Sequence, residues 1–204
     1  MKKILVFFVT LTILLLVSSS DLISQPPSGC PPGTTNSILT TFTINGCDFE
    51  VQICWRCKVT SSPLVYSITS ITQLTFCTPT VDLLEALDSI YVTLQNPTWL
   101  YTFCGDDIPP CSTDTYEFSE VRYNCFKKYQ PSGTPLPPVR NFVCDYSTWC
   151  QKDYSACMLS PGNMQLTVIN DWYQVGVPTC DTDEPNNPDP GKDSDCWLMK
   201  PDCD

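Results

Sequence analysis

The sequence contains no histidine. A Ser-His-Asp or Cys-His nucleophilic system, an HExxH zinc site and a CxxCH haem attachment each need an imidazole nitrogen at one defined place. The absence of histidine therefore excludes these common hydrolase, metalloprotease and c-type haem chemistries. It also removes mixed Cys and His sites from the zinc sites that the cysteines could form.

Basic residues are scarce as well. The chain has 11 Lys and Arg against 22 Asp and Glu, a formal net charge of -11, and charged residues make up only 16% of it. Affinity for phosphate backbones or anionic head groups depends on clustered Lys and Arg. The longest basic cluster is Lys127-Lys128. The composition therefore predicts that nucleic acid is not a partner.

Long apolar runs are also few, and the only one of note lies near the N-terminus. Two lysines precede the run Ile4 to Val17, and small serines follow it at positions 18 to 20. This is the pattern of a secretory signal peptide, which we assign to residues 1–24 with cleavage after Ser20 or Ser24. The run is shorter than the roughly 20 residues that span a bilayer. We therefore predict export through the general secretory route, a secreted or cell-surface location, and no integral membrane span after cleavage.

Cysteine is abundant where histidine is absent. All 14 cysteines follow the predicted signal peptide, and an even number in an oxidising compartment predicts seven disulfides with no free thiol. The predicted half-cystines are Cys30, Cys47, Cys54, Cys57, Cys77, Cys104, Cys111, Cys125, Cys144, Cys150, Cys157, Cys180, Cys196 and Cys203.

The rest of the chain indicates a mainly β fold. Leu39 to Ile44, the turn pair Asn45-Gly46 and Cys47 to Cys54 predict a hairpin, because Asn-Gly readily adopts a type I′ turn. Further strands are predicted at 58–60, 66–76, 99–103, 116–129, 139–144, 149–159, 164–169 and 172–177. Apolar residues at every third or fourth position predict one amphipathic helix at about 79–95, with an N-cap at Thr78. The predicted fold is a set of disulfide-rich antiparallel sheets, sandwich-like, with this one helix.

The organisation along the chain follows from composition. Four prolines between positions 131 and 138 mark an extended connection. It separates a cysteine-rich β domain with one helix, at 25–130, from a second β-rich part, at 139–180, that we expect to pack on the first. Residues 181–204 are predicted to be an acidic tail that is mobile over 181–195 and ends in a disulfide loop.

Cysteine spacing restricts the disulfide pairing. Cys47 and Cys54 stand at the ends of a predicted strand, roughly 23 Å apart, whereas a disulfide needs Cα atoms within about 7 Å. They cannot bond to each other, and the same argument separates Cys150 from Cys157. The segments 104–111 and 196–203 are rich in turn residues, so we predict local bridges Cys104–Cys111 and Cys196–Cys203, with the other ten cysteines linking distant segments.

Two motifs are candidates for chemistry. Cys54-Trp55-Arg56-Cys57 is a CxxC, but a redox CxxC begins a helix and this one precedes a strand-like segment, so we interpret it as two structural half-cystines. A zinc site would need two further thiolates, and no second CxxC is present. The acidic tail offers oxygen ligands for calcium, but Pro185 and the lack of a following glycine depart from the EF-hand loop.

Carboxylates and aromatic rings supply the remaining candidates. Asp106-Asp107 and the pair Glu117 and Glu120 are the groupings that could serve a glycosidase, which needs two carboxyls about 5 to 10 Å apart. Trp55, Trp99 or Trp149 could line a binding face for a sugar or peptide.

The sequence therefore predicts an exported, disulfide-stabilised structural or ligand-binding protein. We expect it to have no catalytic activity, cofactor or metal, and to have an extracellular protein or glycan as partner. The alternative is an extracytoplasmic enzyme that uses a carboxylate pair or a CxxC thiol-disulfide exchange.

Overall fold

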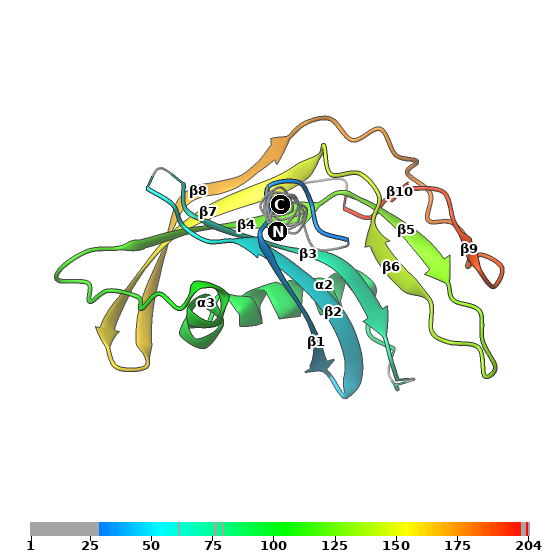
Figure 1. Ribbon diagram of the computed structural model, residues 1–204, viewed down its shortest axis with the longest axis horizontal. Helices are drawn as coiled ribbons and strands as arrows, with labels where there is room; N and C mark the ends of the chain where they lie inside the picture. The colour runs from blue at the N-terminus through cyan, green and yellow to red at the C-terminus, as the bar shows by residue number, and fades with distance from the viewer. Residues whose placement is uncertain (1–28, 61, 76, 79, 201–202, 204) are drawn as a thin grey trace, which may run out of the picture.

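The computed structural model describes residues 29–200 and 203, apart from positions 61, 76 and 79. The predicted signal peptide at 1–24 lies outside the described residues. Figure 1 shows a strongly twisted sheet whose strands fan out above two helices. The mainly β prediction is confirmed, and the ten described strands belong to one hydrogen-bonded sheet rather than to two packed sheets.

The predicted hairpin is confirmed as β1 (Asn36–Ile44) and β2 (Cys47–Arg56). The two strands pair antiparallel along their lengths, from Asn36 opposite Trp55 to Ile44 opposite Cys47. Asn45 and Gly46 take φ angles of 51° and 83° in the turn. These left-handed angles match the twist of the two strands, which explains why Asn-Gly specifies this connection.

The sheet divides at β3 (Leu64–Gln73). One edge of β3 pairs with β2, while the other is shared by β4 (Tyr116–Tyr123), which is parallel, and β6 (Arg140–Val143), which is antiparallel. Beyond β4 lie β7 (Trp149–Ser160) and β8 (Asn163–Val175). Beyond β6 lies β5 (Cys125–Gln130), which also pairs with the short strands β9 (Lys192–Asp193) and β10 (Trp197–Leu198). Strands that precede the proline-rich connection in sequence and strands that follow it are therefore interleaved in one sheet.

The helices are α2 (Leu83–Leu94) and α3 (Pro97–Cys104). The predicted helix is confirmed, but it begins at the N-cap Asp82, whose carboxylate accepts hydrogen bonds from the backbone of Leu84 and Glu85. The strand predicted at 99–103 is wrong, because α3 occupies these residues. Asn96 and Pro97 end α2 and at once begin α3, since Asn is a preferred N-cap and Pro fits the first helical turn.

The main hydrophobic core lies where the sheet meets the two helices. Apolar residues at alternate positions of β2 are fully buried, as the period of two in a strand requires. The largest fully buried apolar side chains are Phe49, Val51, Ile53, Leu64, Tyr66, Ile68, Ile71, Ile90, Leu94, Leu100 and Phe118.

All fourteen cysteines form disulfides, and both predicted local bridges are wrong. The bridges are Cys30–Cys54, Cys47–Cys77, Cys57–Cys104, Cys111–Cys157, Cys125–Cys180, Cys144–Cys196 and Cys150–Cys203. The two pairings that strand geometry excluded, 47 with 54 and 150 with 157, do not occur.

The chain path explains why the turn-rich segments do not close on themselves. Cys104 ends α3 beside Trp55 of β2, while the segment at Pro110 runs along β7 and brings Cys111 to Cys157. The C-terminal segment does not form a terminal loop either. It pairs with β5 through β9 and β10, and Lys128 contacts Glu184 at 2.6 Å.

The connectivity makes opposite predictions for two double variants. Replacing Cys104 and Cys111 by Ser should leave two titratable thiols, Cys57 and Cys157, because each loses a different partner. Replacing Cys111 and Cys157 by Ser should leave no free thiol and cost about 2–4 kcal/mol of unfolding free energy. Thiol titration in denaturant and urea unfolding measure these results. A local 104–111 bridge would reverse the thiol counts.

Candidate functional site

A buried carboxylate lies on the helix side of β4. The side chain of Glu120 is fully buried, and its oxygens accept hydrogen bonds from Arg122 Nε at 2.6 Å, Gln95 Nε2 at 2.9 Å and the Tyr66 hydroxyl at 3.3 Å. A buried charge of this kind is tolerated only when it is paired and its remaining lone pairs are satisfied. Glu120 meets this condition, so it is held in place rather than left available to a substrate.

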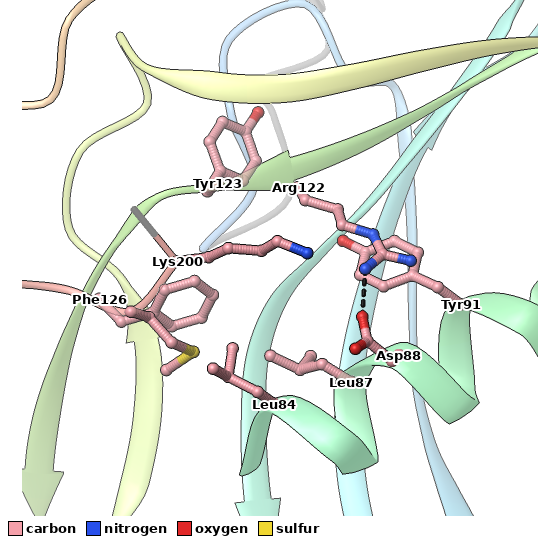
Figure 2. A pocket seen from close by; sticks show the side chains of 9 residues that line it. Leu84, Leu87, Asp88, Tyr91, Arg122, Tyr123, Phe126 and Lys200 are labelled. Carbon is pink, nitrogen blue, oxygen red and sulfur yellow. Dashed lines mark hydrogen bonds and ion pairs between the residues drawn. The ribbon is translucent and has the colours of Figure 1, made fainter. Parts of the chain in front are cut away.

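Arg122 extends this network between two aromatic rings. Its guanidinium lies 4.5 Å from the ring centroid of Tyr91 on α2 and 4.6 Å from that of Trp172 on β8. Arg122 also forms an ion pair with Asp88 of α2, which Figure 2 shows as a dashed line. One cation therefore connects α2, β4 and β8 through charge and cation–π contacts.

A small hollow opens beside Arg122 (Figure 2). Its free volume is about 330 Å³, including the open mouth. Leu84, Leu87, Phe126 and Met199 give it an apolar lining, and Lys200 extends across it toward Arg122. Because Asp88 and Glu120 already neutralise Arg122, the hollow combines apolar walls with a single ammonium group.

A second cluster lies on the opposite face of the same strands, and it is built around Asp153 of β7. Asp153 Oδ1 accepts hydrogen bonds from Ser119 Oγ at 2.6 Å and Gln151 Nε2 at 2.8 Å. Asp153 Oδ2 accepts hydrogen bonds from Asn170 Nδ2 at 2.9 Å and the Tyr173 hydroxyl at 3.2 Å. One carboxylate therefore orients four polar side chains from three neighbouring strands.

The ionised form of Asp153 is favoured by these contacts. Partial burial raises the pKa of this carboxyl, but the four hydrogen bonds outweigh burial and hold its pKa below the ordinary value. Asp153 is therefore a fixed acceptor for its neighbours at neutral pH.

Trp149 places an aromatic ring beside this cluster. Trp149 Nε1 donates to Gln151 Oε1 at 3.3 Å, and its ring meets that of Tyr123 edge-on at 6.4 Å. Asn170 is exposed, Tyr173 is 38% exposed, and both border a shallow open hollow. We call this surface the β7–β8 patch. It comprises Ser119, Trp149, Gln151, Asp153, Asn170 and Tyr173.

The structure does not assemble the motifs on which the enzyme alternative depends. Cys54 and Cys57 belong to separate disulfides, with Cys30 and Cys104, so they do not form the vicinal pair that thiol exchange uses. Glu117 and Glu120 lie on opposite faces of β4, and only Glu117 is exposed. Asp106 and Asp107 are exposed in the loop after α3.

The three candidate tryptophans lie in different environments. Trp55 is buried and donates from Nε1 to the Phe103 carbonyl at 2.5 Å. Trp99 packs on Phe42, with ring centroids 5.4 Å apart. Both belong to the core or its edge, and only Trp149 takes part in a polar surface.

Sequence reasoning missed the other members of the patch. A signal for them was present, because residues 149, 151 and 153 alternate along one predicted strand and therefore share a face. Asn170 and Tyr173 were harder to find. They reach the same carboxylate although they are three residues apart, because the pairing of β7 with β8 shifts register between Gln151 and Asp153.

The described part of the chain has no group of three or more Cys, Asp or Glu side chains arranged to hold a metal ion. None of its helices is both long and apolar enough to cross a membrane. The chain matches no protein-family model, and the comparisons with curated proteins and with solved structures give no significant match.

The buried network makes a stability prediction. Glu120→Ala removes the partner of Arg122 at a fully buried position, so we expect a loss of about 3–5 kcal/mol of unfolding free energy. Asp88→Ala removes the exposed partner and should cost less than about 1 kcal/mol. Urea unfolding followed by tryptophan fluorescence measures both. Equal losses would contradict the assignment of Glu120 as the main partner.

Proposed function

We propose that this protein is an exported, disulfide-stabilised binding protein that holds a neutral glycan on the β7–β8 patch and does not alter it. Seven disulfides are typical of an oxidising extracellular environment, which agrees with the export predicted from the sequence.

The observation that carries the proposal is the organisation of polar groups around Asp153 next to Trp149. A sugar offers hydroxyls that both donate and accept hydrogen bonds, and C–H faces that pack on aromatic rings. Gln151, Asn170 and Tyr173 supply oriented polar groups, and Trp149 supplies a ring face at low entropic cost. All of them stand on strands, which hold such groups more firmly than loops do.

Charge favours a neutral ligand. The chain carries a net charge of -11, and the patch itself contributes the carboxylate of Asp153. The cations on the strands β4 and β7, Arg122 and Lys152, lie on the other face and are paired with acids. A sulfated or uronic glycan would therefore meet repulsion, whereas an uncharged oligosaccharide would not.

Binding is favoured over hydrolysis for a simple geometric reason. Glycoside hydrolysis uses two carboxyls facing each other across the scissile bond. The patch as defined has one, Asp153, which is engaged through both oxygens by its neighbours. The other carboxyl on this face, the exposed Glu117, stands opposite Ser155 in the β4–β7 pairing and outside the patch. A carboxylate held in this way orients other groups rather than acting as an acid or nucleophile.

Binding is tested on an array of neutral and acidic oligosaccharides, followed by calorimetry with the tightest neutral ligand. We expect retention without turnover, and an affinity about tenfold weaker for Trp149→Ala because the stacking surface is lost. The matched control is Tyr101→Ala, which removes an aromatic ring that is 53% exposed on α3. Its affinity should equal that of the wild type. Failure of every glycan to bind, or equal losses in the two variants, would contradict the proposal, and turnover would favour the enzyme alternative.

The same site predicts a pH dependence. Because hydrogen bonding lowers the pKa of Asp153, the ionised form persists below the ordinary pKa of about 3.9 and is lost only as pH falls through the lowered value. Glycan affinity should therefore be constant from pH 7 to about pH 4 and decline below it. Asp153→Asn should bind weakly without this decline. A midpoint near pH 5 in the wild type would contradict the assignment.

A further inference from the structure

Strand β1 forms a free edge of the sheet. It pairs with β2 through all nine of its residues, and its other edge forms no backbone hydrogen bond with any residue that the structure describes. In an antiparallel strand, every second residue directs its N–H and C=O toward that open side. The outer edge of β1 is therefore a row of donors and acceptors that a further strand could satisfy.

The sequence of β1 does not protect this edge. Soluble proteins usually block a free strand with charge, proline or a bulge. β1 (NSILTTFTI) contains neither charge nor proline, and its pairing with β2 continues without a register shift. Leu39 is 59% exposed, and Thr41 and Thr43 beside it are also exposed.

The absence of charge in β1 makes this edge the place where a second copy of the chain can approach. Two molecules that each carry a net charge of -11 repel each other over most of their surfaces. The uncharged strand β1 lets their backbones approach without placing like charges opposite each other, and the second copy brings a strand of identical length.

The strand is also complementary to itself. Antiparallel pairing of Asn36–Ile44 with its own copy is centred on Thr40. It places Ile38 opposite Phe42 of the second copy, and Leu39 opposite Thr41 of the second copy. Ile38 and Phe42 lie on the core side, where Phe42 already packs on Trp99 at 5.4 Å. The pairing would therefore extend the apolar edge of the core as well as the hydrogen-bond ladder.

We propose that β1 pairs antiparallel with β1 of a second copy, forming a twofold-symmetric homodimer with one continuous sheet. Each copy contributes the same surface, which is the usual form of a closed dimer. This proposal is independent of glycan binding, since the β7–β8 patch lies beyond β4, away from β1 in the strand order.

The test is the molar mass of the mature protein by sedimentation velocity between about 1 and 100 µM. The wild type should be dimeric at the upper concentrations, and added salt should strengthen the dimer by screening the repulsion between acidic copies. Leu39→Glu with Thr41→Glu should be monomeric throughout. The matched control, Val92→Glu with Leu159→Glu, adds the same charge at other exposed apolar positions and should stay dimeric.

A third variant tests the register. Leu39→Lys with Thr41→Glu places Lys at position 39 of each copy opposite Glu at position 41 of the other copy. These two opposite-charge pairs should restore the dimer that the double glutamate variant loses. Near-UV circular dichroism and the absence of free thiols confirm that each variant is folded. A monomeric wild type at 100 µM, or dimerisation that persists in the double glutamate variant, would overturn the proposal. Binding of an extended peptide by a monomeric wild type would show a different occupant of the edge.

Discussion

The structure depends on how the sheet divides at β3, and the division places an unusual demand on one residue. β4 belongs to one branch and β5 to the other, yet only Asn124 joins them. Asn124 is fully buried, so its polar groups need partners. Its side chain donates to the Lys200 carbonyl at 2.9 Å and accepts from Gln174 at 3.2 Å, and its carbonyl accepts from Met199 N at 2.8 Å. The hydrogen-bonding groups of Asn124 thus find their partners in β8 and in the C-terminal segment. This requirement explains why that segment packs back against the sheet.

Hydrogen bonds alone are a weak attachment for the C-terminal segment. β9 and β10 each have two residues, so their pairing with β5 adds little stability. Three disulfides, Cys125–Cys180, Cys144–Cys196 and Cys150–Cys203, join this segment to β5, to the residue after β6 and to β7, which are 52 to 55 residues away in sequence. Bridges over such long loops remove much of the conformational freedom of the unfolded chain. The described residues from Cys180 onward are therefore held mainly by covalent links, and the buried environment of Asn124 relies on them.

The features that sequence reasoning predicted correctly are those determined by neighbouring residues. The β1–β2 hairpin follows from Asn45-Gly46, and α2 follows from its apolar period. The exclusion of a Cys47–Cys54 bridge needed only the length of a strand. The incorrect predictions concern choices that local composition does not decide. Asn96-Pro97 both stops one helix and starts another, and a turn-rich segment such as 104–111 can close on itself or extend. Here it extends because Pro110 pairs beside Met158. The Asp153 cluster required a register shift between β7 and β8, and no single strand reveals such a shift.

The position of two disulfides bears directly on the proposed glycan site. The strand that carries Trp149, Gln151 and Asp153 is bridged at Cys150 to the C-terminal segment and at Cys157 to the loop before β4. On the opposite face of the same strands, Arg122 and Lys152 both contact the ring of Trp172 and tie β4 and β7 to β8. The strands that carry the patch are therefore fixed by two disulfides and by the cation–π contacts on their opposite face. A ligand that binds it does not have to order these side chains, so less of the binding energy is lost as conformational entropy. This rigidity therefore adds to the affinity that the polar groups and the rings of Trp149 and Tyr173 can supply to an uncharged ligand.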